Sequence, residues 1–300
     1  MAFLPRFIAP VLLAMAATAS MAQSGSSLDM AAIEQITGLK GTFSKEENVF
    51  KVSKPRTDIK VQIDNWPAPP FMGLTSWAAF TPTSGSDVMV MGDIVLFEDE
   101  VNRVMSVALD SGLDVTALHN HFFFDRPKVY FMHIGGTGAV DQLSTGVKKV
   151  FAAVAQIRGA TPTPATAFFG QISGKNAITL EPIDTILGVK GQASDGMYKV
   201  VIGRTATMHG VQVGNQMGVN TWAAFAGSDD QAVVDGDFAM TEDELQPVLK
   251  TMRAGGINIV AIHQHMTQEQ PRYMFLHYWG KGRAAELAKV VKQALDVQQK

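Results

Sequence analysis

The sequence contains one unit twice, and this duplication constrains the fold more than any other feature. The segment from Gly92 to Gly138 aligns without a gap with the segment from Gly236 to Gly282, at an offset of 144 positions. Upstream, GLTSWAAF and GVNTWAAF end at Phe80 and Phe225. A repeat of this length indicates two copies of one structural unit. We expect the copies to form a pseudo-twofold pair that resembles a fused homodimer.

The chain divides into four parts. Residues 1–22 have the features of a secretory signal: one charge at Arg6, an apolar run, and small residues at Ser20 and Ala22. We expect the first repeat unit over residues 23–158 and the second over 181–300. Residues 159–180 are expected to be a linker and a lead-in strand, because Pro162 and Pro164 favour an extended chain.

Helix and strand patterns follow the same order in both units. In the first unit, alternation predicts strands at Val88 to Phe97, Val115 to Phe122 and Val129 to Ile134. Helical spacing predicts helices at Glu98 to Ser111 and Val140 to Ala155. This order contains the elements of a ferredoxin-like split βαβ unit. We therefore expect an α+β protein of two pseudo-symmetric repeats, each a mainly antiparallel sheet with helices on one face.

Composition excludes several classes of function. The formal net charge is only −3, so no nucleic-acid partner is expected. The sequence has no cysteine, which excludes disulfides, thiolate catalysis and a lipid-modified cysteine. After signal cleavage we expect no membrane anchor and a periplasmic or secreted protein. The partner is expected to be an unknown small molecule or cell-envelope ligand, and the sequence leaves the oligomeric state open.

Six of the seven histidines lie in two equivalent stretches. They are His119, His121 and His133 in the first unit, and His263, His265 and His277 in the second. Residues two apart on a strand share a face, so the pattern predicts a β-hairpin with three imidazoles on one face in each unit. With the turns centred on Pro127 and Pro271, His121 should lie opposite His133, and His265 opposite His277.

Three imidazoles on one patch of a sheet can bind a divalent transition metal and leave coordination positions open. Imidazole suits zinc, copper, iron or nickel, so the ligand type alone does not select the metal, and zinc or copper is expected. Two other interpretations are a polar site for a non-metal ligand and a structural cluster of hydrogen bonds. The sequence therefore predicts an exported protein with a histidine-rich transition-metal site in each repeat, with or without enzymatic activity. The alternative is a non-catalytic periplasmic binding module for a cell-envelope or small polar ligand.

Repeated acidic residues flank the histidine stretches. Asp93 and Asp237 each follow a glycine in a strand, where they either orient an imidazole or cap a bulge or turn. Glu98 and Glu242 begin a predicted helix, where the helix dipole favours acids. A second interpretation is that they complete a set of three histidines and one glutamate around a metal.

Other residues carry weaker signals. Arg56 and Arg204 either bind an anionic substrate or form surface ion pairs. Trp77 and Trp222 are expected in the core, and His209, which has no repeat partner, on the surface. No GxSxG, HExxH or paired-carboxylate motif is present, so no catalytic residue is assigned.

The first repeat contains the run GDIVLFEDEVNRVMSVALDSGLDVTALHNHFFFDRPKVYFMHIGGTG, with SWAAF upstream and a second copy downstream. This sequence resembles the LppY/LpqO family of exported bacterial proteins. The resemblance covers nearly all of the mature chain. The second copy departs from it by placing Met266-Thr267-Gln268 where the first has three phenylalanines. The resemblance implies an exported protein built from a duplicated domain of unknown function. Named members are lipoproteins, but this chain lacks the cysteine for lipid attachment, so anchoring is not implied.

Overall fold

The computed structural model describes residues 28–299. The expected signal segment, residues 1–22, lies outside the described residues. The helices are α1 (Met30–Thr37), α2 (Glu98–Asp110) and α3 (Val140–Ala160) in the first unit, and α4 (Leu180–Leu187), α5 (Glu242–Ala254) and α6 (Ala284–Asp296) in the second. Within residues 28–299, no helix is both long enough and apolar enough to cross a bilayer.

The strands of the first unit are β1 (Gly41–Ser44), β2 (Val49–Pro55), β3 (Val61–Ile63), β4 (Trp66–Ala68), β5 (Thr75–Pro82), β6 (Val88–Phe97), β7 (Asp114–His119), β8 (Asp125–Arg126) and β9 (Val129–Gly138). The strands of the second are β10 (Gln192–Ser194), β11 (Met197–Gly203), β12 (Ala206–Met208), β13 (Val211–Val213), β14 (Asn220–Gly227), β15 (Ala232–Thr241), β16 (Asn258–His263) and β17 (Tyr273–Gly282). Two short 3-10 helices, η1 (Asn215–Met217) and η2 (Val297–Gln299), complete the second unit.

A single 12-stranded sheet runs through both units. Its order is β1-β2-β5-β6-β9-β7 followed by β16-β17-β15-β14-β11-β10, and all neighbours are antiparallel. The second half repeats the first in reverse, so a pseudo-twofold axis lies between β7 and β16. Within each unit, β6-β9-β7 and β15-β17-β16 have the strand order of a split βαβ unit. The expected α+β architecture of two pseudo-symmetric repeats is confirmed.

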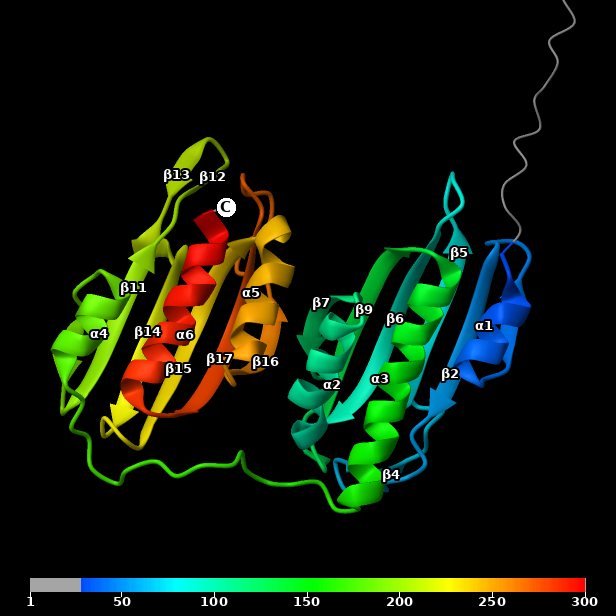
Figure 1. Ribbon diagram of the computed structural model, residues 1–300, viewed down its shortest axis with the longest axis horizontal. Helices are drawn as coiled ribbons and strands as arrows, with labels where there is room; N and C mark the ends of the chain where they lie inside the picture. The colour runs from blue at the N-terminus through cyan, green and yellow to red at the C-terminus, as the bar shows by residue number, and fades with distance from the viewer. Residues whose placement is uncertain (1–27, 300) are drawn as a thin grey trace, which may run out of the picture.

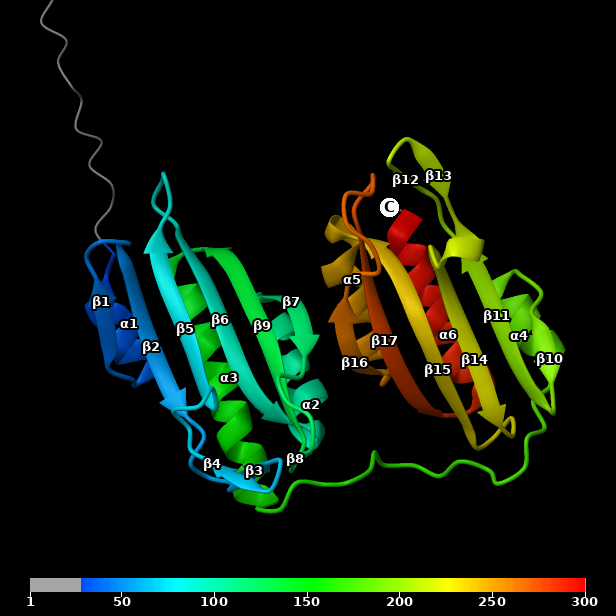
Figure 2. The same cartoon turned by 180° about the vertical axis from the view of Figure 1, so that it is seen from behind.

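The helices cover one face of this sheet, and the opposite face, here called the bare face, is largely free of them (Figures 1 and 2). Strand alternation produces this arrangement, as β5 buries Ser76, Ala78 and Phe80 and leaves the residues between them half-buried. The main core lies between sheet and helices and includes Val104 of α2 and Val147 of α3.

Local sequence signals set the helix ends. The side chain of Asp29 accepts a hydrogen bond from Ala32 N at 2.9 Å, which caps α1, and Gly38 ends the helix with a left-handed φ of 72°. The N-termini of α2 and α5 are capped in a different way. The side chains of Glu100 and Glu244 accept hydrogen bonds from the backbone N–H groups of Phe97 and Thr241, respectively.

Two small cores cover opposite ends of the bare face. In the first unit the three-stranded sheet β4-β3-β8 buries Val61 and Leu74 against Phe97 and Phe131 of the main sheet. In the second unit, the two-stranded sheet β12-β13 packs against the main sheet in the same way, and the core between them includes Phe275. The part of the bare face that borders these small cores carries the histidines.

The units join where β7 meets β16. Leu118 pairs with Ile262, and these residues occupy equivalent positions in the repeat. Both are buried in the main core, on the helix side of the sheet. The strands share no other residue pair, so side chains supply the remaining hydrogen bonds across the junction.

Two amide side chains bridge the junction reciprocally. Asn102 of α2 donates to Ile259 O at 3.0 Å and accepts from Ile259 N at 2.7 Å. Gln246, the equivalent residue of α5, donates to Val115 O at 2.9 Å and accepts from Val115 N at 3.0 Å. Each amide thus satisfies both backbone groups of a residue at which strand pairing is irregular.

The connection between the units begins later than the sequence indicates. Helix α3 continues through Gly159 to Ala160, two residues into the segment expected as linker. Residues 161–179 form no helix or named strand, and one isolated bridge joins Ala177 to Ser228. This segment passes along one edge of the molecule in both ribbon views (Figures 1 and 2).

We predict that Asn102→Ala lowers the free energy of unfolding by about 1–3 kcal/mol, because it leaves the buried N–H and C=O of Ile259 unpaired. The matched variant Gln246→Ala should lower the free energy of unfolding by a smaller amount, because the hydrogen bonds of Gln246 are only partly buried. Urea denaturation measures both. An unchanged midpoint for Asn102→Ala would show that this amide does not stabilise the junction.

Candidate metal centre

In the first unit the three predicted histidines gather on the bare face. His119 ends β7 and His133 lies on β9, with 5.1 Å between their ring centroids. His121 follows β7, and its ring centroid lies 5.1 Å from that of His119. His121 also stacks on Phe131, with 3.4 Å between centroids and an interplanar angle of 6°.

The second unit repeats this arrangement. The ring centroid of His263 lies 4.7 Å from that of His277 and 5.1 Å from that of His265. His265 stacks on Phe275 at 3.5 Å, as His121 does on Phe131. In each unit a phenylalanine therefore supports the middle histidine over the sheet, although that histidine lies outside the strand.

The expected register of the hairpin is wrong. His133 lies opposite Ala117, and His119 lies opposite Phe131, so His121 is not the cross-strand neighbour of His133. The second unit has the same pairing, with His277 opposite Ala261 rather than His265.

Two features of the loop explain the error. The pairing of His119 with Phe131 centres the hairpin on Asp125 rather than on Pro127, and β7 ends at His119, so His121 lies in the loop. The loop that follows is not a symmetric turn, because Asp125 and Arg126 leave the hairpin to pair with β3. Asp125 also holds the loop by accepting a hydrogen bond from Val129 N at 2.6 Å.

An aspartate adjoins each histidine cluster. Asp93 of β6 pairs with His133 of β9, and Asp237 of β15 pairs with His277 of β17. Both aspartates are buried, Asp237 to 4% exposure. One carboxylate oxygen, Oδ1, has no hydrogen-bond partner in either. A buried, partly unsatisfied carboxylate beside imidazoles is an unusual and costly arrangement that a bound cation would relieve.

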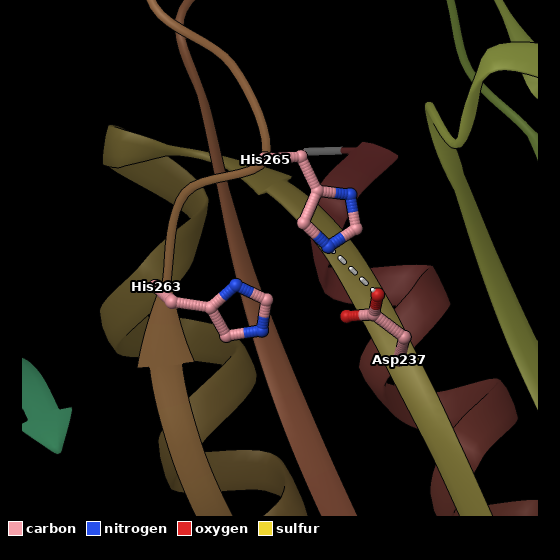
Figure 3. A group of neighbouring side chains, drawn as sticks. All are labelled: Asp237, His263 and His265. Carbon is pink, nitrogen blue, oxygen red and sulfur yellow. Dashed lines mark ion pairs between the residues drawn. The ribbon is translucent and has the colours of Figure 1, made fainter. Parts of the chain in front are cut away.

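In the second unit, three side chains bring their donor atoms together (Figure 3). One donor atom each from Asp237, His263 and His265 lies within 4.8 Å of the others. His265 Nε2 is 3.1 Å from Asp237 Oδ2, and His263 Nε2 is buried without a partner. Among the residues that the structure describes, this is the group that meets such a spacing.

Backbone carbonyls orient the imidazoles around this group. His265 Nδ1 lies 3.2 Å from Gly218 O, and His277 Nδ1 lies 3.4 Å from Gly236 O. An Nδ1–H that donates to a carbonyl leaves Nε2 with a free lone pair. Gly218 presents its carbonyl from a left-handed conformation, with φ of 80°, which suits glycine. No pattern in the sequence indicates this role of Gly218, because only the fold brings its loop near His265.

Burial has opposite consequences for the two kinds of donor: it disfavours the ionised carboxylate of Asp237, and it favours the neutral imidazole of His263. It raises the pKa of Asp237, against the opposing effect of His265, His277 and His263. Burial also lowers the pKa of His263, and nearby His277 lowers it further. A neutral imidazole offers the lone pair that binds a metal.

The first unit shows the same electrostatic pattern. Burial raises the pKa of Asp93, opposed by His133, His121 and His119. Burial lowers the pKa of His121, and the nearby His119 adds to this effect. Both units therefore place a buried carboxylate beside an imidazole that resists protonation.

The arginine candidates form ion pairs with glutamates inside the protein. Arg56 is buried and pairs with the fully buried Glu100 through N–O distances of 2.8 and 3.0 Å. Arg158 Nε lies 2.7 Å from the same carboxylate. Arg204 pairs with Glu244 at 2.6 Å. These ion pairs are structural, and they are more buried than the surface pairs that the sequence suggested.

The remaining candidates lie elsewhere. Glu242 begins α5, five residues beyond Asp237, and forms an exposed ion pair with Arg272 at 3.5 Å. Glu98 begins α2 at the equivalent position. Trp77 and Trp222 were expected in the core, but they are half-buried on the bare face, where Lys51 and Lys199 lie over their rings. The alternation of β5 and β14 directs both indoles away from the helices. His209 is exposed.

We predict that Glu100→Gln lowers the free energy of unfolding by about 3–5 kcal/mol, because it leaves the buried cations Arg56 and Arg158 without their shared carboxylate. The matched variant Glu244→Gln should lose less, since the Arg204 side chain is 25% exposed. Guanidinium denaturation compares them. Equal losses would contradict this assignment of the buried network.

A family model described as Domain of Unknown Function (DUF1259) matches the chain over residues 31–153 and again over 181–297. The two matches fall on the two repeat units. No curated protein matches the chain.

Two solved structures have limited similarity to the chain. The double-ringed trimeric shell protein of the RMM microcompartment is 13% identical, with 73% of this chain and 84% of that chain covered and a TM-score of 0.19. The trimeric bacterial microcompartment shell protein PduB is 10% identical, with coverages of 86% and 89% and a TM-score of 0.21. These TM-scores are too low to bear on the fold or function of this chain.

Proposed function

The chain belongs to the family described as Domain of Unknown Function (DUF1259), whose model matches both units, and from this premise we propose that each unit binds a divalent transition metal. In the second unit the donors are Asp237, His263 and His265, with His277 beside them. The equivalent donors of the first unit are Asp93, His119 and His121, with His133 beside them. The observation that carries the proposal is the pair of buried, unpartnered atoms Asp237 Oδ1 and His263 Nε2.

The donor chemistry narrows the choice of metal. Two imidazoles and a carboxylate suit zinc and copper, and three protein donors leave at least one coordination position open. His265 is exposed, which places the open position toward solvent on the bare face. An open position is what a metal needs to bind a small ligand or to activate water.

A pocket of about 540 Å³ adjoins the second site. His277, Asp235, Trp279 and Lys281 line it together with Phe168 of the connecting segment. It offers a carboxylate, an ammonium and an indole, which suits a small polar ligand. We therefore propose metal-dependent recognition of such a ligand as the function of the second site.

Any hydrolytic reaction here would use Asp235 as the proton acceptor. Asp235 lies two residues before Asp237 and on the same face of β15. Glu242 does not qualify, because it lies five residues beyond Asp237, roughly 16 Å along the strand. The same distance argues against the interpretation that Glu242, or its equivalent Glu98, completes a set of three histidines and one glutamate around a metal.

Titration of the untagged protein with zinc and copper, followed by isothermal calorimetry, tests the proposal. His265→Ala should weaken binding at one site by at least about 100-fold, since even an outer partner of a metal ligand contributes about 10–100-fold. Asp237→Asn should act in the same direction because it removes the anionic donor.

His209→Ala is the matched control, because His209 is the histidine outside both clusters and is exposed. Its affinity and stoichiometry should equal those of the wild type. Binding that survives His265→Ala unchanged, or that His209→Ala weakens equally, would refute the assigned site.

We also propose that the protein is exported, on the basis of the signal-like sequence of residues 1–22. Expression of the full chain in a Gram-negative host should give a mature N-terminus at Gln23 in the periplasmic fraction. N-terminal sequencing measures this, and an intact chain confined to the cytoplasm would contradict export.

A further inference from the structure

A second pocket lies at the junction of the two units, and the proposed metal function does not use it. Its volume is about 440 Å³. Three parts of the chain build it: the start of α2 with Tyr130, the connecting segment around Phe168, and Arg253 with residues 258–260 of the second unit. Such a volume is in the range of small-molecule sites, which often lie between domains.

Arg253 places a positive charge in this pocket without a matching acid. Its guanidinium donates to Ser106 Oγ at 3.1 Å, to Ile257 O at 2.7 Å and to Asn258 Oδ1 at 3.2 Å. All three acceptors are neutral, and the three hydrogen bonds use only the Nε and Nη1 atoms of Arg253. Burial lowers the pKa of Arg253 to about 10. Nη2 therefore remains available to a ligand, and an anion would supply the missing countercharge.

The acidic residues of the lining do not fill this role. Asp99 pairs with Arg158 and accepts a hydrogen bond from Ala165 N at 3.1 Å. Within residues 28–299, Glu98 forms no ion pair with Arg253; burial raises the pKa of Glu98, and the nearby cation that opposes this effect is Lys128. Arg103 lies in the same lining, so the pocket contains a second guanidinium.

The rest of the wall is largely apolar. Val101, Tyr130, Phe168, Ile259 and Val260 line it, and Phe168 comes from the connecting segment. Lys281 Nζ donates to Phe168 O at 3.1 Å, which ties that segment to β17. An apolar body can therefore pack between the units while its acid group reaches Arg253.

The pocket breaks the symmetry of the repeat. The residue equivalent to Arg253 in the first unit is Leu109, which is buried in the main core. The fold thus accommodates an apolar side chain at this position, and helix packing does not require arginine. The connecting segment also covers only one of the two equivalent places. Both departures occur at the same pocket.

We propose that the junction pocket binds a small organic anion, with its acid group on Arg253 and its apolar body against Phe168, Tyr130 and Ile259. The site contains none of the proposed metal donors, although Phe168 and Val260 also line the pocket beside the second metal site. It would connect ligand binding to the contact between the two units, because its walls come from both.

The test uses 8-anilinonaphthalene-1-sulfonate as the probe, titrated into the full mature protein in the presence of a chelator. The wild type should bind one equivalent with a saturable rise in fluorescence. Arg253→Met should weaken that binding by at least about tenfold, because it removes a charge-assisted hydrogen bond. Phe168→Ala should also weaken it, since it removes an apolar wall without a change of charge.

Arg272→Met is the matched control, because Arg272 is exposed and its ion pair with Glu242 lies outside the pocket lining. It should bind the probe as the wild type does. An absence of saturable binding by the wild type would overturn the proposal. Unchanged binding by folded Arg253→Met, or equal weakening by Arg272→Met, would also overturn it. Should Arg253→Met fail to fold, Phe168→Ala decides: weaker binding supports the pocket, and unchanged binding overturns it.

Discussion

The pairing of Leu118 with Ile262 determines where the two histidine clusters lie. These equivalent residues face each other across antiparallel strands and point into the helix-side core. Strand alternation then directs His119 and His263, one residue further along each strand, to the bare face. Both clusters therefore open on the same side of one sheet, on either side of the pseudo-twofold axis. The duplication therefore produces two adjacent histidine clusters, each formed by residues of one unit.

The bare face also explains why a carboxylate is buried beside the imidazoles. The row that crosses β5, β6 and β9 reads Trp77, Asp93 and His133, and the second unit repeats it. Bulky aromatic and imidazole rings on both sides shield the aspartate from water. The units differ in how well the donors assemble, because the Gly218 carbonyl orients His265. Of the two proposed metal sites, the second is therefore the one that we expect to bind more tightly.

Much of the fold could be predicted from the sequence. The repeat, the strand from Val88 to Phe97 and the common face of the histidines follow from spacing alone. The hairpin register could not be predicted, because it depends on the path of the loop after His119, in which β8 pairs with β3. The buried ion pair of Arg56 could not be predicted either, because its partner Glu100 is 44 residues away in the sequence. A partial signal existed for Asp237, which could have been placed opposite His277 by aligning β15 with β17.

X-ray absorption spectroscopy of the zinc-loaded protein tests the metal assignment most directly. The account predicts nitrogen and oxygen neighbours at about 2.0–2.2 Å, together with the outer-shell scattering of at least two imidazoles. Replacement of His265 by alanine should remove part of the imidazole scattering from the second site. A spectrum of hydrated zinc with no imidazole signature would contradict the central claim.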